Sequence, residues 1–160
     1  MKQRRTLFAL AAVVGTVALT SALLAQSTEP WFGTWKLNVA RSKYSPGPGP
    51  KTSTTKLEPW EGGFKHSTEF VTAQGETRHV EYTGKFDGKD NLVAGHSNAD
   101  TINYRRIDDH TYEVVEKKNG KATTTATVVI SGNGLIRTQT MTGKNAQGQT
   151  VNNVLSYDRQ

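Results

Sequence analysis

The side chains that could carry out chemistry in this sequence are few and scattered. None of the four histidines, His66, His79, His96 and His110, stands at the spacing of a zinc site. The chain has no cysteine, so a thiol nucleophile is excluded, and it has neither a Gly-x-Ser-x-Gly elbow nor a phosphate-binding loop. We therefore predict no catalytic residue, no metal site and no cofactor.

His66 is the histidine that the sequence pattern places in the interior. Phe64, His66 and Phe70 fall on one face of a strand-like segment, because alternate residues of a strand point the same way. Such a histidine is either a hydrogen-bonded core residue or a polar contact for a bound molecule. An enzyme that uses His66 with a nearby acid, or a haem protein that uses it as a ligand, is therefore one alternative.

The elements that must position these side chains are strands. After residue 30 the apolar residues alternate with period two, turn-forming residues interrupt them every 8 to 12 positions, and no helical period is sustained. Asn119-Gly120 is the strongest hairpin signal, residues 87–91 predict a polar turn, and residues 92–100 show no clear pattern. We predict an all-β fold, a single antiparallel up-and-down β-barrel of about 8–10 strands, since closure removes exposed strand edges.

The first predicted strand is followed by a strap. Trp35, Leu37 and Val39 share the face that we expect to be buried. Prolines and glycines then alternate over residues 46–50, and neither a helix nor a sheet can continue through them.

The N-terminal segment resembles an export signal. Lys2, Arg4 and Arg5 precede an apolar run, and small or hydroxylated residues follow it. We predict a signal peptide over residues 1–25, cleaved between positions 22 and 27, and a barrel domain over 26–160. The protein is then periplasmic or secreted, with no stable membrane anchor after cleavage; Arg4-Arg5 leaves the twin-arginine and general secretory routes both open.

The charge of the mature chain excludes one class of partner. Of the 20 Lys and Arg residues three belong to the leader, so 17 remain against 14 acidic residues, a net charge near +3. No basic cluster is interleaved with aromatic residues, and we predict no nucleic-acid binding. We expect a monomer.

The two ends of the mature chain carry a family resemblance. The run Phe32-Gly33-Thr34-Trp35-Lys36-Leu37 and the closing run Tyr157-Asp158-Arg159 resemble the ends of calycins, the superfamily of lipocalins and fatty-acid-binding proteins. The resemblance implies a small barrel with a cavity, closed by Gly33, Trp35 and Arg159. A guanidinium stacked on a buried indole contributes about 1 to 2 kcal/mol, so these three residues need no ligand to explain them.

The resemblance does not extend to the fatty-acid clamp. The family's carboxylate-binding arginine falls on Leu155, and the segment expected to hold its second inward arginine, residues 122–130, contains none. Residues 40–51 are also too short and too rich in Pro and Gly for the family's helical lid.

The leading functional hypothesis is an exported lipocalin-like barrel that binds a small apolar molecule without catalysing a reaction. The predicted lining is mostly apolar with a few polar groups: Phe64, His66, Phe70, Tyr82, Tyr104, Tyr112, Met141, Leu155 and Tyr157. A second alternative is a barrel filled by its own side chains that acts as an interaction module of the cell envelope. Barrels of about eight strands allow either state.

Overall fold

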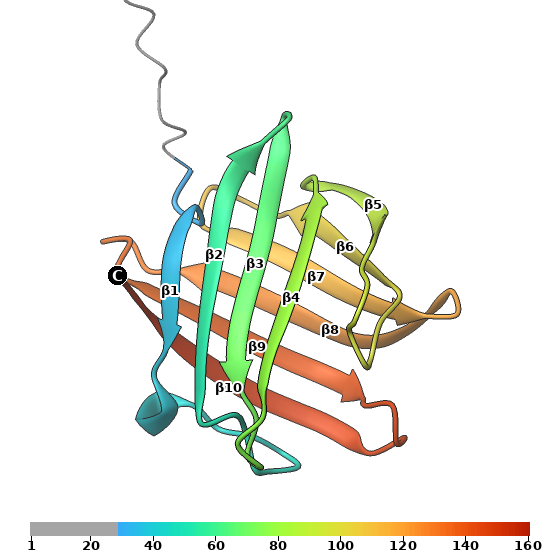
Figure 1. Cartoon of the computed structure of the whole chain (residues 1–160). Helices are drawn as coiled ribbons and strands as arrows, with labels where there is room; N and C mark the ends of the chain where they lie inside the picture. Colours follow the sequence, from blue (N-terminus) through green and yellow to red (C-terminus); the bar gives the residue numbers. More distant parts are fainter. Residues whose placement is uncertain (1–28) are drawn as a thin grey trace, which may run out of the picture.

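A computed structural model describes residues 29–160 of the chain (Figure 1). The predicted signal peptide lies outside these residues. The described part consists of ten strands and one short 3-10 helix (η1): β1 (Gly33–Leu37), η1 (Val39–Arg41), β2 (Thr52–Trp60), β3 (Gly63–Val71), β4 (Thr77–Gly84), β5 (Asp87–Leu92), β6 (Thr101–Arg106), β7 (Thr111–Lys118), β8 (Lys121–Ile130), β9 (Ile136–Lys144) and β10 (Thr150–Arg159). In the described range, no helix is long and apolar enough to cross a membrane.

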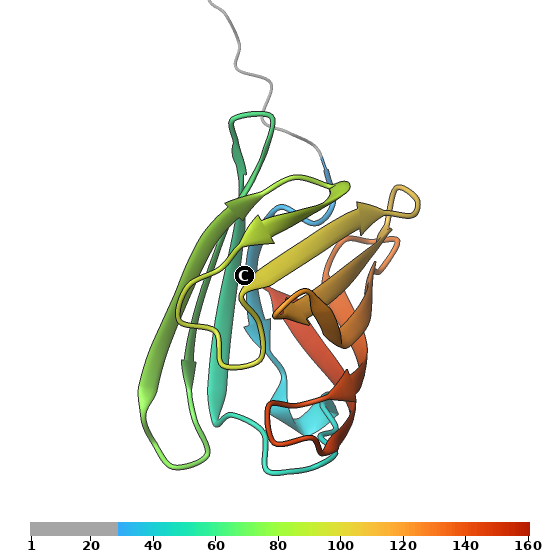
Figure 2. The same ribbon diagram turned by 90° about the vertical axis from the view of Figure 1, so that its right-hand side faces the viewer.

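The strands form one antiparallel sheet in the order β4-β3-β2-β1-β10-β9-β8-β7-β6-β5. Every neighbouring pair in the sheet is also consecutive in the chain except β1 and β10, which bring the two ends of the described chain together. The strands β1–β4 cross in front of β6–β10 in Figure 1, and Figure 2 shows the two halves facing each other. The sheet thus curls into a nearly closed barrel, which confirms the predicted all-β up-and-down fold.

The barrel is open along one seam. The two strands at the free edges of the curled sheet are β4 and β5, and within residues 29–160 no hydrogen-bonded ladder joins them. The loop of residues 93–100 follows β5 on the same side. This seam matters for access to the interior.

The contact between β1 and β10 closes the barrel at the chain ends. Arg159 lies opposite Trp35 in the ladder, with its guanidinium carbon 4.3 Å from the indole centroid. Arg159 also donates to the carbonyl oxygens of Phe32, Pro30 and Gly134. The indole Nε1 of Trp35 donates to a main-chain carbonyl at 2.9 Å.

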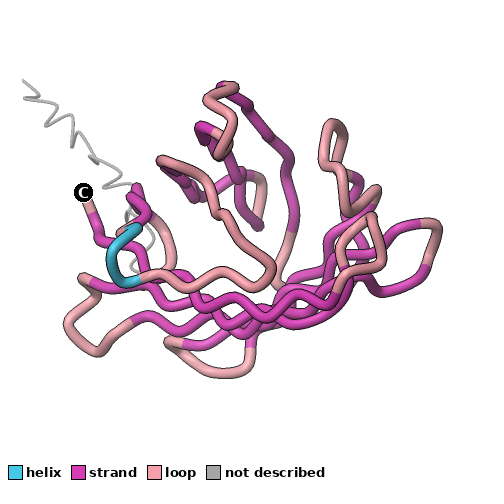
Figure 3. The backbone as a smooth tube through the Cα atoms, turned by 90° about the horizontal axis from the view of Figure 1, so that it is seen from below, coloured by secondary structure: helices cyan, strands magenta, loops and turns pink. Residues whose placement is uncertain are grey.

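Two local predictions are wrong. Residues 87–91 form most of β5 and not a turn; this edge strand is largely exposed and therefore has no apolar alternation to reveal it. The first strand ends at Leu37, and Val39 lies in η1 with about half of its surface exposed. Figure 3 shows this single helical turn in cyan at the border of the strands.

The Pro-Gly strap is held against β10. Lys43 and Val154 exchange main-chain hydrogen bonds, and Asn152 N–H donates to the carbonyl of Ser45 at 2.7 Å. Tyr44, which precedes the prolines, packs on the buried core. Because its ring is partly buried there, beside Tyr157, the pKa of Tyr44 is raised.

Candidate functional site

An interior cavity of about 200 Å³ lies between the two halves of the sheet. Its wall combines apolar and polar side chains from most of the strands: Thr55, His66, Thr68, Phe70, Val80, Tyr82, His96, Ile102, Tyr104, Val114, Glu116, Arg137, Gln139, Met141, Leu155 and Tyr157. The volume is small beside the 300–1,000 Å³ of drug-sized ligand pockets. The cavity therefore suits a small molecule and is too small for haem.

The structure brings most of the predicted lining residues together here. His66, Phe70, Tyr82, Tyr104, Met141, Leu155 and Tyr157 all line the cavity. Phe64 and Tyr112 do not line it, because both are fully buried in the packed aromatic layer described next. The role of all nine residues in ligand binding stays a prediction.

An aromatic layer fills one end of the barrel. The rings of Trp31, Phe64, Phe86, Tyr104 and Tyr112 are packed in tilted or edge-to-face pairs, with centroid separations from 4.6 to 6.0 Å. The barrel is therefore neither wholly filled nor wholly hollow. The aromatic layer occupies the end where the chain enters β1, and the cavity occupies the remainder.

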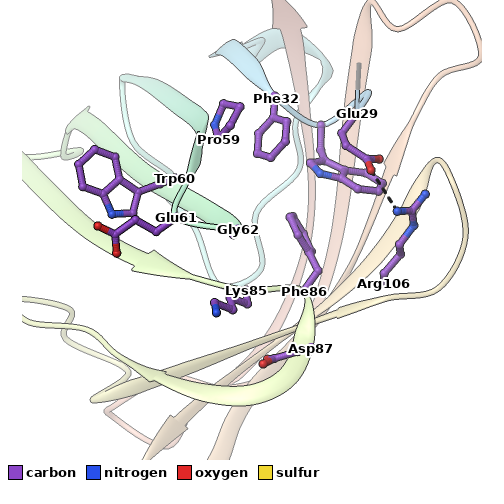
Figure 4. Close-up of a pocket in the computed structure, with 12 residues that line it drawn as sticks. Glu29, Phe32, Pro59, Trp60, Glu61, Gly62, Lys85, Phe86, Asp87 and Arg106 are labelled. Atoms are coloured by element: carbon purple, nitrogen blue, oxygen red, sulfur yellow. Dashed lines mark hydrogen bonds and ion pairs between the residues drawn. The ribbon is translucent and has the colours of Figure 1, made fainter. Parts of the chain in front are cut away.

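A wider hollow of about 650 Å³ lies on the outer side of this layer (Figure 4). Phe32, Pro59, Phe86 and the half-exposed Trp60 form its apolar surface. Its charged groups are exposed or paired with each other, such as Glu29 and Arg106 at 3.2 Å, so the hollow is a solvated depression. The smaller interior cavity is the better candidate site because its polar groups are buried and incompletely paired.

Arg137 of β9 is the least expected of these polar groups. Only 6% of its surface is exposed, and no carboxylate within residues 29–160 forms a salt bridge with it. Its Nε donates to the hydroxyl of Tyr112 at 3.2 Å and its Nη2 to Gln139 Oε1 at 3.0 Å, whereas Nη1 is buried without a partner. A buried cation of this kind is costly unless an anion joins it.

The electrostatic surroundings of Arg137 keep it charged. Burial lowers its pKa, but the adjacent Tyr112, Tyr157 and Tyr104 more than offset this, so that the pKa is raised. The guanidinium carbon also lies 4.7 Å from the ring centroid of Tyr157, in a cation–π contact. The cavity therefore contains a permanent positive charge with one free donor.

Sequence reasoning missed Arg137, although a signal was present. Arg137 and Gln139 stand four and two positions before Met141, which was predicted to face inward. Alternation along one strand places all three on the same face. The family resemblance places inward arginines at position 155 and within residues 122–130, whereas the inward arginine of this chain lies on β9.

His66 lies in the cavity wall as a neutral imidazole. Burial lowers its pKa to about 3, with further contributions from Arg137 and His96. The ring stacks on Tyr82 at 4.6 Å, Nε2 lies 3.4 Å from the hydroxyl of Thr68, and Nδ1 is buried without a partner. In the described range no carboxylate forms a hydrogen bond or ion pair with His66, so the acid–histidine pair that an enzyme would need is not formed there.

Two tyrosines join the halves of the sheet across the interior. The hydroxyls of Tyr82 on β4 and Tyr104 on β6 are 2.5 Å apart. Burial raises the pKa of both groups, so both stay protonated at neutral pH. This bond joins β4 to β6 across the interior, on the side of the barrel where no ladder joins β4 to β5.

The other charged group in the wall is Glu116 of β7, of which 8% is exposed. Its Oε2 accepts a hydrogen bond from the hydroxyl of Thr124 at 2.7 Å. Its Oε1 lies 3.5 Å from Nε2 of His96, longer than an ordinary hydrogen bond. His96 belongs to the loop after β5, and its Nδ1 is buried without a partner.

A neighbouring hollow adjoins the cavity beside the seam. This hollow of about 240 Å³ lies between β4 and the loop of residues 93–100, and it shares Phe70, Val80 and His96 with the cavity wall. Within the described residues no group of three or more His, Asp or Glu side chains could hold a metal ion. The site is thus a cavity with a cation, an incompletely paired carboxylate and a neighbouring hollow that shares part of its wall.

Comparisons with known proteins reveal only a distant likeness. No family model and no curated protein matches the chain. A solved structure of zebrafish ileal bile acid-binding protein in complex with cholic acid is similar, with 11% sequence identity and a TM-score of 0.45, over 82% of this chain and 99% of that chain. The described residues themselves show an all-β architecture, a nearly closed antiparallel barrel of ten strands.

Proposed function

We propose that this protein binds a small, largely apolar molecule with one acidic group inside the barrel, without catalysing a reaction. The observation that carries the proposal is Arg137, a buried guanidinium in the wall of the cavity with one nitrogen that has no hydrogen-bond partner. A carboxylate would pair with it bidentately or through a single charged bond. The apolar part of the molecule would contact side chains such as Ile102, Val114 and Leu155.

The affinity for an acid should depend on Arg137 in a way that the affinity for a neutral analogue does not. Calorimetric titration of octanoate and octanol into the wild type and into Arg137→Met tests this. We expect octanoate to lose at least tenfold in affinity in the variant, since charged hydrogen bonds contribute about 1.5–3 kcal/mol. Octanol should change by less than about threefold, within the scatter of such contributions.

Arg105→Met provides the matched control, since Arg105 is exposed and pairs with Glu113 on the outer surface. Octanoate should bind this variant as it binds the wild type. If neither octanoate nor octanol binds the folded wild-type protein, the proposed function is wrong.

We also propose that the protein acts outside the cytoplasm as a monomer. The basic start and apolar run of residues 1–25 support export. Mass spectrometry of the protein recovered from the periplasm and medium should reveal an N-terminus between positions 23 and 28. Recovery of the intact chain in the cytoplasm would contradict this part of the proposal.

A further inference from the structure

The interior cavity contains two opposite charges that do not pair with each other. Arg137 and Glu116 both line it, and both are more than nine-tenths buried. The carboxylate of Glu116 lies 3.5 Å from Nε2 of His96, and within residues 29–160 no salt bridge joins it to Arg137. Buried charges are normally paired, so each of these groups has interaction capacity left for a ligand.

Strand register separates the two charges along the barrel. On β8, Thr124 is level with Glu116 of β7. Further along the same strand, Ile130 is level with Arg137 of β9. The two levels are therefore six residue steps apart, roughly 20 Å of strand, and the long side chains of Arg137 and Glu116 shorten this distance from both ends.

The wall between the two charges is mixed. Tyr104 is close enough to both for their fields to act on it: Arg137 lowers its pKa and Glu116 raises it. Ile102, Val114 and Met141 add apolar surface to the same cavity. A molecule that extends from one charge to the other would thus cross an apolar middle section.

The Glu116 end is suited to a hydrogen-bond donor. A carboxylate only accepts, and its two oxygens offer about four positions. Thr124 occupies one of them at 2.7 Å, and the contact with His96 at 3.5 Å is long. His96 lies where the cavity borders the neighbouring hollow. Because Oε1 has only this weak partner, an incoming hydroxyl or ammonium group could replace it without breaking a strong bond.

From these observations we propose that the ligand is bifunctional: a carboxylic acid whose acid group pairs with Arg137 and whose far end carries a hydroxyl or ammonium group that donates to Glu116. This inference rests on the proposed function and narrows its ligand class. The unpartnered Nδ1 of His66 lies in the same wall and offers a further contact for such a ligand.

The test is a titration of the wild type with octanoate, ω-hydroxyoctanoate and ω-aminooctanoate. We expect at least one of the two substituted acids to bind about tenfold more tightly than octanoate, the effect of one charged hydrogen bond. The substituted acid that binds more tightly than octanoate shows whether the donor is a hydroxyl or an ammonium group. Equal or weaker binding of both substituted acids would overturn the inference and leave the proposed function intact, whereas failure of all three to bind would overturn both.

Glu116→Gln should abolish the gain, measured as the ratio of the affinities for the substituted acid and for octanoate in that same variant. Glu113→Gln is the control on the same strand, since Glu113 faces outward and pairs with Arg105; this variant should retain the full preference. A preference that persists in a folded Glu116→Gln protein would overturn the inference. If that variant does not fold, the wild-type series alone decides between the outcomes above.

Discussion

The guanidinium carbon of Arg137 lies 4.7 Å from the ring centroid of Tyr157, in the interior position where a buried arginine would normally meet a carboxylate. An aromatic face attracts the cation but does not satisfy its N–H donors. The polar bonds of Arg137 run to the neutral Tyr112 and Gln139. Within the described residues the buried charge of Arg137 thus lowers the stability of the folded protein. Such a cost is typical of a residue that serves binding.

The first prediction follows from that cost. Arg137→Met should leave the free energy of unfolding unchanged or raise it by up to about 2 kcal/mol, because the desolvation of a guanidinium is exchanged for an apolar contact. Two neutral hydrogen bonds are lost, which limits the gain. Urea denaturation followed by tryptophan fluorescence measures the change. A loss of more than about 2 kcal/mol would instead make Arg137 a structural residue.

Substitution of Arg159 should have the opposite effect on the free energy of unfolding. It is stacked on Trp35 and donates to three main-chain carbonyl groups that tie the chain ends together. We expect Arg159→Ala to lower the free energy of unfolding by roughly 2 to 4 kcal/mol, the cation–π contact and the lost hydrogen bonds together. Arg105→Ala, which removes an exposed ion pair, should cost less than about 1 kcal/mol in the same denaturation experiment. Equal effects of the two variants would contradict a closing role for Arg159.

Gly33 makes the approach of Arg159 possible, and this gives a third prediction. Its φ of +135° is a conformation that side chains disfavour, and a Cβ atom there would lie 2.6 Å from Nη1 of Arg159. Gly33→Ala should therefore cost roughly 1 to 3 kcal/mol of unfolding free energy. Gly132 is the control: no atom lies within 4 Å of its Cβ position. Gly132→Ala should be close to neutral, and a similar loss in both variants would show that the contact with Arg159 is unimportant.

The sequence predicted the strands well where one face of a strand is buried. β3 and β8 alternate in burial as their apolar periodicity indicates, and the Asn119-Gly120 turn joins β7 to β8. β5 was missed because it is an exposed edge strand held by its ladder to β6 and by polar contacts, such as Lys117 with Asp90. A strand that is exposed to solvent on both faces has no hydrophobic alternation in its sequence, so the pattern cannot predict it.

The cavity could be predicted only in part. Alternation along single strands identified residues such as His66 and Tyr82, but the separation of an aromatic layer from a hollow depends on how distant strands are aligned. Arg137 was missed for a related reason. A charged residue in a threonine-rich strand is usually exposed, and only its position relative to Met141 indicated the interior.

The last prediction concerns pH and His66. The folded pKa of this histidine is lowered to about 3 from an ordinary 6.5, chiefly by burial. Between these values the unfolded chain binds a proton that the folded protein does not bind. The stability is therefore fully present above about pH 6.5 and decreases as the pH falls, with a slope approaching ~1.4 kcal/mol per pH unit.

From about pH 7 to about pH 5, where most carboxylates keep their charge, this single group should lower the free energy of unfolding by about 2 kcal/mol. Urea denaturation at the two pH values measures the loss in the wild type. His66→Gln should remove most of it, because the amide does not titrate, whereas His79→Gln, at an exposed histidine, should retain it. A pH dependence that survives in the His66 variant would mean that the folded protein accepts a proton at this position, and a neutral imidazole in the cavity wall would then be wrong.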